Sequence, residues 1–458
     1  MSSVEQRSSL QHTAIVRQKP LMNMRQILLM NLGFFGIQYS FGMQQTAVNP
    51  VYEFLGANPG DLPILNLAGP ITGLLIQPLI GALSDRTWSP RWGRRKPFFI
   101  AGAIGCSICL FLFPFVTAVW MAVLLLWLLD ASNNTAMEPY RAFIADKLPP
   151  SQLGKGFLAQ SFFTGLGITL ANISLYVFQQ LIDGATKAGI PYWVVGSFML
   201  GAVCSIGTVL VSVLTTPEIP PSAEELAALR AKRGGFGSAM REIGEAIVEM
   251  PPELRKLGLV YLFQWYGMVC YWQFVALSIW KSVFPPTDQG KEDAVAWTGL
   301  VNGWYNIVTF SVAFSLVAFA RRRGAKVVHC VCLMLAAVGL LIFPSVSNKY
   351  LLFIPIIGLG IAWASIMGVP YIMAVRMIPS TRYGVYMGII NMMIVVPMLI
   401  QSVTFGAIYE NVLDANPNNA IRFAGVLLGL AGLTMLWIKE PPIVRDVDEV
   451  SYMPSAGH

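Results

Sequence analysis

The sequence predicts an all-α membrane protein whose twelve transmembrane helices form two six-helix bundles. Three observations carry this prediction. Only 12% of the 458 residues are charged, 55% are hydrophobic, and the mean hydropathy is +0.60. Twelve long apolar stretches recur along the chain, and short motifs repeat between its halves. So low a charged fraction excludes a soluble protein of this length, a disordered chain and, despite the net charge of +7, a nucleic-acid binder.

Each apolar stretch is long enough to cross a hydrocarbon core of about 30 Å. The stretches are 26–48, 62–83, 97–117, 119–147, 157–181, 192–214, 258–280, 296–320, 326–344, 350–376, 384–408 and 419–438. Gly and Pro interrupt several of them, which neighbouring helices in a membrane tolerate. The first 25 residues are polar and lack the apolar core of a signal peptide.

The basic residues predict the orientation. If the chain crosses the membrane twelve times, 25 of its 31 Lys and Arg residues lie on the side of the termini and five on the other side. Cytoplasmic loops carry the excess of Lys and Arg. We therefore expect a multi-pass protein of the cell membrane with both termini in the cytoplasm.

The longest polar segment divides the chain into six helices plus six. The predicted organisation is an N-terminal tail (1–25), a first bundle (26–214), a cytoplasmic loop (215–257), a second bundle (258–438) and a C-terminal tail (439–458). In the loop, Ser222 to Glu225 resemble a helix-capping box. An apolar stripe then predicts a helix on the membrane surface, although a linker of fixed reach is an equal alternative. The stripe consists of Met240, Ile243, Ile247 and Met250.

The two halves share motifs at corresponding places. The pair Pro139-Tyr140 recurs as Pro370-Tyr371, 231 positions later (370 minus 139). Each pair stands near the end of the fourth apolar stretch of its half. Parallel six-helix repeats joined by a central loop are typical of alternating-access transporters, which bind their substrate between the halves.

The loop between the second and third stretches carries an ordered motif. Gly-Ala-Leu-Ser-Asp-Arg is followed by Gly-Arg-Arg-Lys. A small residue allows close helix packing, a carboxylate faces a helix terminus, and forked guanidinium groups bind carboxylates of neighbouring helices. We expect a cytoplasmic gate rather than a loop that only sets topology. Its residues are Gly81, Asp85, Arg86, Arg94, Arg95 and Asp146. The second half has only Arg321-Arg322-Arg323-Gly324 at this place, a degraded or purely topogenic counterpart.

The fourth stretch, 119–147, is unusually polar. At about 100° per residue, Asp130, Asn134, Glu138 and Arg141 fall on one narrow arc, which must face a cavity or other helices. Asp130 lies midway along the stretch and has no cation at helical spacing. Because a carboxylate in low dielectric favours its protonated form, Asp130 is the first proton-binding candidate and Glu138 the second. Alternatively, Asp130 is a hydrogen-bonded residue that only supports helix packing, and Glu138 and Arg141 form an ion pair with the same structural role.

These motifs resemble a known family. The Gly81 to Arg95 region matches the cytoplasmic signature of the major facilitator superfamily. The runs Leu129-Asp130, Asn133-Asn134 and Arg141-Ala142 resemble the fourth helix of the plant sucrose–proton symporters and of their animal and bacterial relatives. The likeness is close over roughly residues 30–147, and the second half matches only by architecture.

The resemblance implies the major facilitator fold and cotransport of a disaccharide or glucoside, of sucrose or maltose type, with a proton. It maps the family's essential aspartate onto Asp130, and Arg141 and Asp146 also match. Two positions depart from the plant pattern: Glu138 stands where glycine is usual, and Asn172 is the central polar group of a fifth stretch without arginine. No cofactor is expected, and the partners are a sugar, protons and the lipid bilayer, with the protein a monomer.

Sugar binding needs convergent hydrogen-bonding groups and flat apolar faces. The predicted contacts are Gln38, Gln44, Asn134, Arg141, Asn172, Gln264, Trp272, Asn302, Asn306 and Asn391. Any one amide is also a common link between membrane helices. In the first stretch Gln44 follows the family pattern, whereas Gln45 shares a helical face with Gln38, and the choice stays open.

Three other functions are alternatives to sugar–proton cotransport. Proton-driven efflux of apolar compounds would use few amides, and a non-transporting sugar receptor would need a signalling domain. An enzyme would need a nucleophile–base or metal-ligand constellation, and the Cys106–Cys109 pair lies inside an apolar stretch without a second pair. Sodium coupling is the alternative to proton coupling.

Overall fold

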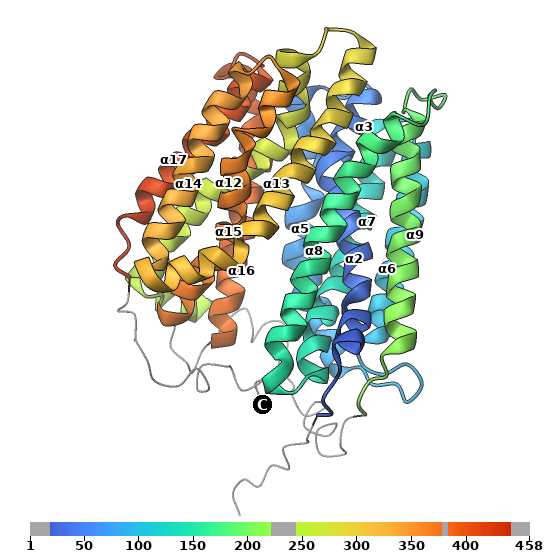
Figure 1. Ribbon diagram of the computed structural model, residues 1–458, viewed down its shortest axis with the longest axis vertical. Coiled ribbons are helices and arrows are strands. Elements are labelled where there is room, and N and C mark those ends of the chain that lie inside the picture. The colour runs from blue at the N-terminus through green and yellow to red at the C-terminus, as the bar shows by residue number, and fades with distance from the viewer. Residues whose placement is uncertain (1–18, 221–243, 378–382, 441–458) are drawn as a thin grey trace, which may run out of the picture.

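The computed structural model describes residues 19–220, 244–377 and 383–440. Within these residues the predicted all-α fold is confirmed, with twelve long helices (Figure 1). They are α2 (Met24–Thr46), α5 (Ala68–Arg86), α6 (Lys96–Leu112), α7 (Val119–Lys147), α8 (Pro150–Gln179), α9 (Tyr192–Thr215), α12 (Pro252–Val283), α13 (Asp288–Arg323), α14 (Ala325–Ile342), α15 (Ile356–Met377), α16 (Tyr383–Asn411) and α17 (Pro417–Met435). By length and composition alone, seven spans of the described chain can cross a membrane.

Several helices differ from the predicted stretches for local reasons. α13 begins eight residues before the expected 296 because the Thr287 hydroxyl accepts a hydrogen bond from Gly290 N at 3.0 Å and caps the helix. α8 begins at Pro150, a residue that favours the first helical position. The stretch 350–376 is divided into η4 (Lys349–Phe353) and α15, with Pro355 between them.

The loop 215–257 is only partly described. Residues 244–248 are helical, and in this segment Ala246 is buried whereas Val248 is exposed. The predicted capping box at Ser222 lies outside the described residues, as do Met240 and Ile243 of the apolar stripe.

The two bundles pack by one repeated pattern. In the first, α2 packs against α8 and α9, α6 against α7 and α9, and α5 against α7. In the second, α12 packs against α16 and α17, α14 against α15 and α17, and α13 against α15. Between the bundles, α8 meets α13 and α5 meets α16. Each helix contact of the first bundle thus has its counterpart in the second bundle, as the predicted repeat requires.

The third helix of each bundle begins in the same way. Gly93 and Gly324 have φ of +78° and +90°, the left-handed region that favours glycine, and they are 231 positions apart (324 minus 93). Glu218, after α9, accepts hydrogen bonds from the backbone N–H groups that open α6. Glu440, after α17, accepts them from Ala325 N and Lys326 N at 2.9 and 3.1 Å. The segment at 321–324 is therefore a structural counterpart of the first motif, not a purely topogenic run.

We call the end of the molecule that carries residues 19–24 and 436–440 the terminus side. The opposite end, which carries residues 53–61, 180–191, 284–287 and 412–416, is the distal side. Described hydrogen bonds and ion pairs between the bundles lie toward the distal side and involve α2, α3 (Val48–Phe54), α8, α9 and α13. The distal side is thus closed.

Candidate functional site

Asp130 lies at the centre of a polar cluster formed by three helices. Its side chain is buried in α7, where Gln44 Nε2 of α2 donates a hydrogen bond to Oδ1 at 2.7 Å. The hydroxyl of Thr72 in α5 and, at 3.2 Å, Asn134 Nδ2 both donate to Oδ2. Gln77 Nε2 donates to Asn134 Oδ1 at 2.8 Å and extends the cluster. We call these five residues the α7 cluster.

All the donors in the α7 cluster are neutral. Within the described part of the chain, no Lys or Arg forms an ion pair with Asp130. The carboxylate can therefore take up a proton without breaking an ion pair, and its neighbours can rotate to accept the new hydrogen bond. Gln44 Oε1 is buried and has no partner among the described residues, so it offers an unused acceptor.

Sequence reasoning placed Asp130, Asn134 and Gln44 among the candidates but missed Thr72. Gln77 was also not among the predicted site residues. Thr72 and Gln77 lie in α5, and the spacing of residues within α7 cannot indicate which groups of another helix face it. The signal available was the presence of polar side chains in an apolar stretch.

The residues of the predicted arc on α7 lie at different depths along the helix. Arg141 is exposed, and its Nη2 lies 3.7 Å from Met137 Sδ. Eleven residues separate Arg141 from Asp130, which at about 1.5 Å per residue places them roughly 16 Å apart along the helix. A shared angular position does not bring them together. The side chain of Glu138 lies outside the described residues.

Two predicted sugar contacts join the bundles instead of facing an open site. The Thr46 hydroxyl of α2 donates to Asn172 Oδ1 of α8, and Asn302 Nδ2 of α13 donates to Thr46 Oγ1 at 3.1 Å. Tyr271 donates to Asn302 Oδ1 at 2.7 Å, and Asn306 Nδ2 donates to the Asn302 carbonyl at 2.8 Å. With the distal side closed, these amides are held by protein groups.

In the second bundle, Gln264 contacts a histidine. His329 Nε2 lies 3.1 Å from Gln264 Oε1, and Nδ1 lies 2.8 Å from Ser365 Oγ. His329 is fully buried and links α12, α14 and α15. Gln264 Nε2 is buried without a partner in the described chain, so it can donate to a ligand.

Aromatic rings lie on α12 and α15, the helices that correspond to α2 and α7 in the repeat. Trp363 makes edge contacts with Trp265 and Trp272, with ring centroids 5.8 and 5.4 Å apart. The indole N–H of Trp265 is buried without a described partner. Trp272 therefore belongs to a three-tryptophan cluster, which offers flat apolar faces and one free donor.

The remaining amide candidates are separate from the α7 cluster. Gln38 is buried in α2, where Gly167 of α8 packs against its Cβ. Asn391 is half-buried in α16. In a further buried pair, Gln401 Nε2 donates to Gln273 Oε1 at 2.8 Å.

Three of the predicted gate residues, Arg94, Arg95 and Asp146, make contacts on the terminus side. Arg95 Nε donates to Asp146 Oδ2 at 2.8 Å, and Arg95 Nη1 donates to Ser84 Oγ at 2.6 Å. Arg94 Nε donates to the Ser84 carbonyl at 3.3 Å. These contacts tie the loop between α5 and α6 to the end of α7.

Two features of this gate differ from expectation. Gly81 was expected to allow close helix packing, but a Cβ placed there would meet no atom of another described element within 4 Å. Glu218 was not predicted, because nothing in the sequence places it against a loop more than a hundred residues earlier. The side chains of Asp85 and Arg86 lie outside the described residues.

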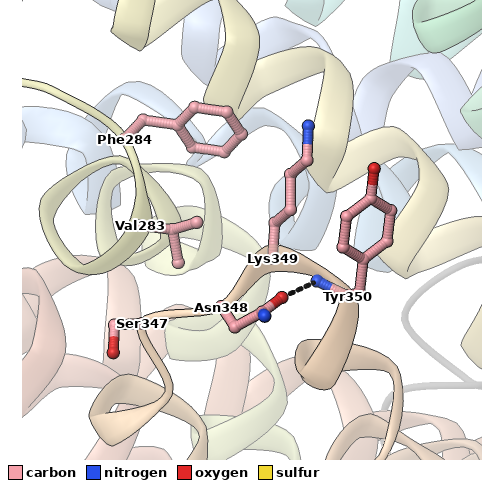
Figure 2. A pocket seen from close by; sticks show the side chains of 6 residues that line it. All are labelled: Val283, Phe284, Ser347, Asn348, Lys349 and Tyr350. Atoms are coloured by element: carbon pink, nitrogen blue, oxygen red, sulfur yellow. Dashed lines mark hydrogen bonds between the residues drawn. The ribbon is translucent and has the colours of Figure 1, made fainter.

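Two surface cavities lie on the distal side. One, of about 520 Å³, is lined by the end of α12 and residues 347–350, where Asn348 Oδ1 accepts a hydrogen bond from Tyr350 N (Figure 2). The other, of about 370 Å³, lies between residues 179–193 of the first bundle and 289–293 of the second. Neither cavity is lined by a predicted sugar contact.

Comparisons with known proteins agree with this architecture. Residues 30–402 match the Major Facilitator Superfamily. The chain is 23% identical to sucrose transport protein SUT5 of Oryza sativa subsp. indica, over 92% of this chain and 88% of the relative. It is 24% identical to sucrose transport protein SUC4 of Arabidopsis thaliana (81% of each chain) and 26% identical to human solute carrier family 45 member 3 (66% and 61%).

Solved structures show the same fold. A D-xylose-proton symporter superposes with a TM-score of 0.66 at 16% identity, over 90% of this chain and 97% of that one. The nucleoside transporter NupG also gives 0.66, at 14% identity over 91% and 100%. The predicted resemblance is confirmed, and the protein is a membrane transporter rather than an enzyme. The chain belongs to the Major Facilitator Superfamily.

Proposed function

We propose that this protein is a proton-coupled symporter that imports a disaccharide or glucoside of sucrose or maltose type. The observation that carries the proposal is the α7 cluster, in which neutral groups hold a buried carboxylate. The names of the sucrose transport proteins among its relatives support a sugar as substrate. The excess of Lys and Arg on the terminus side supports a cell-membrane protein with cytoplasmic termini.

In this mechanism Asp130 takes a proton from the distal side while sugar binds between the bundles. Neutralising Asp130 removes the cost of burying its charge and favours closure over the loaded site. Thr46, Asn172 and Asn302 then bond to one another as the distal side closes. The bundles separate on the terminus side, and sugar and proton leave to the cytoplasm.

Sugar recognition combines both bundles. The unused Gln44 Oε1 beside Asp130 can accept from a sugar hydroxyl, and Gln264 Nε2 can donate to one. The tryptophan cluster supplies the apolar face on which a pyranose ring stacks. Because Gln44 also bonds to Asp130, a change in the protonation of Asp130 reaches the sugar through a single side chain.

The test is uptake into proteoliposomes. Labelled mono- and disaccharides, sucrose and maltose included, are offered under an imposed pH or sodium gradient. A proton gradient of about 60 mV should raise wild-type accumulation of the substrate roughly tenfold. Asp130→Asn should retain sugar exchange but lose accumulation driven by pH, because its amide cannot cycle a proton.

Asp183→Asn is the matched control, since Asp183 is an exposed carboxylate on the distal side and should keep wild-type accumulation. Retained pH-driven accumulation in Asp130→Asn would contradict the role of Asp130. If only a sodium gradient drove accumulation, sodium and not the proton would be the coupling ion. Failure of every disaccharide would favour proton-driven efflux of apolar compounds instead.

A further inference from the structure

Three consecutive residues at the start of α13 close the distal side. Residues 291–293 each contact a different element of the first bundle. The contacts are Lys291 with Glu53 of α3 (Nζ to Oε2, 3.4 Å), Trp193 of α9 with Glu292 (Nε1 to Oε2, 3.2 Å) and Gln179 of α8 with Asp293 (Nε2 to Oδ1, 2.8 Å). We call these three contacts the distal gate.

Glu53 is the least satisfied member of the distal gate. Its side chain is only 4% exposed, and its Oε1 has no hydrogen-bond partner among the described residues. The 3.4 Å separation from Lys291 Nζ exceeds the roughly 2.7–2.9 Å of a charge-assisted hydrogen bond. The carboxylate has thus lost most of its water without gaining a full set of protein donors.

Lys291, in contrast, has other partners. Its Nζ lies 5.6 Å from the ring centroid of Phe54 and 5.7 Å from that of Trp280, within the range of cation–π attraction. Its side chain is also more exposed than that of Glu53, at 20%. The ammonium therefore keeps stabilising contacts when Glu53 is neutral.

We propose that Glu53 is a second proton-binding site and that a proton bound there favours closure of the distal gate. The inference requires alternating access, but it depends neither on a sugar substrate nor on proton binding by Asp130.

The preference for the closed form follows from solvation. When the distal gate opens, Glu53 meets water and has the ordinary pKa of 4.5. In the closed structure, burial raises the pKa of Glu53 to about 7, while Lys291 lowers it by less. The closed form therefore binds this proton more tightly, so acidification stabilises closure, and the stabilisation is lost as pH rises through about 7.

Other charged groups around Glu53 do not reverse this sign. On α16, Tyr409 interacts electrostatically with both Glu53 and Glu410, and a tyrosine stays neutral at physiological pH. Glu410 itself is exposed and screened by water. α12 carries Lys281 in its last turn, and residues 119–129 at the start of α7 include no ionisable side chain.

The test measures the distal gate directly by electron paramagnetic resonance. Spin labels at Lys187→Cys and Val412→Cys report the distance between the two bundles at their exposed distal ends. The measurements use full-length protein without native cysteines and without sugar. The Asp130→Asn background removes the carboxylate on which the proposed transport mechanism depends, so failure here is distinguishable from failure of the transport proposal.

In that background, raising the pH from about 5.5 to about 8.5 should lower the ratio of closed to open protein roughly 30-fold. Glu53→Gln, which mimics the protonated form, should reduce this change to less than about twofold. The matched control Glu410→Gln should keep the full change. No pH response with Glu53 present, or a full response in Glu53→Gln, would overturn the proposal.

A second variant tests the proposal if Glu53→Gln does not fold. Lys291→Gln removes the cation that favours ionised Glu53, so the midpoint of the transition should move to higher pH. A purely structural ion pair would weaken closure at every pH without moving the midpoint. An unchanged or lower midpoint would overturn the proposal.

Discussion

Asn302 of α13 donates a hydrogen bond of 3.1 Å to the hydroxyl of Thr46 in α2, and the same hydroxyl donates to Asn172 of α8. One small side chain thus satisfies amides from both bundles. All three residues are buried. The bond between Asn302 and Thr46 can exist only while the bundles are together, so it belongs to the closed distal side.

Thr46→Val should shift the protein toward a form that is open on the distal side. Valine has nearly the same shape as threonine but leaves two buried amides without their partner. The expected cost to the closed form is about 1–3 kcal/mol, which corresponds to a roughly 5- to 150-fold lower closed-to-open ratio. The spin-label pair described above measures this ratio. In the control Thr298→Val, the lost hydroxyl bonds only to the Ala294 carbonyl of its own helix at 2.7 Å, and the ratio should stay unchanged. Equal ratios in the two variants would contradict the bridging role of Thr46.

Thr72→Val should raise the pH at which proton-driven uptake is half-maximal. The Thr72 hydroxyl donates to Asp130 Oδ2 and so stabilises the ionised carboxylate, and its loss favours the protonated form. The measurement is initial uptake as a function of external pH. In the control Thr135→Val, the hydroxyl bonds at 2.8 Å to the Ala131 carbonyl within α7, and the pH profile should match the wild type. A shift to lower pH in Thr72→Val would refute this role.

Glu218→Gln should destabilise the first bundle. The Glu218 carboxylate accepts backbone hydrogen bonds of 2.7, 2.9 and 2.9 Å at the start of α6, and an amide replaces a charged acceptor by a weaker one. We expect a loss of about 1–2 kcal/mol, seen as a lower midpoint of thermal unfolding in detergent. Glu440→Gln, at the corresponding place in the second bundle, should cause a similar loss. An unchanged midpoint in both variants would show that these caps are dispensable.

Gly93→Ala and Gly81→Ala should have opposite outcomes. Gly93 has a φ of +78°, and an added Cβ would lie 2.5 Å from Glu218 Cδ. The left-handed backbone alone costs a non-glycine residue about 1–2 kcal/mol, so the thermal midpoint should fall. At Gly81 an added Cβ meets no atom of another element within 4 Å in the described part of the chain. Alanine should therefore be neutral or slightly stabilising, because glycine is unfavourable inside a helix. A larger loss at Gly81 than at Gly93 would contradict these local geometries.

The helical architecture was predictable because a membrane reduces the choices open to a chain. Apolar stretches of sufficient length must be helices, and α7 begins and ends where the sequence predicted, at Val119 and Lys147. The repeat was visible in Pro139 and Pro370, which the structure places inside the equivalent helices α7 and α15. Boundaries differed where a cap such as Thr287 extended a helix beyond its apolar stretch.

Asp130 could be identified from the sequence alone because a buried carboxylate is rare and expensive in an apolar helix. Its environment could not, since Gln44 and Thr72 reach it from other helices. Helical periodicity gives the direction of a side chain but neither its depth nor its partners, so Asp130 and Arg141 share an arc although they lie roughly 16 Å apart along the helix. The pattern of amino acids was therefore enough to predict the fold class, the family and the central carboxylate. The folded structure was needed to show that Asn172 and Asn302 bridge the bundles through Thr46, that Glu218 caps α6, and that Glu53 meets Lys291. Each of these contacts joins residues far apart in the chain and depends on how the helices pack.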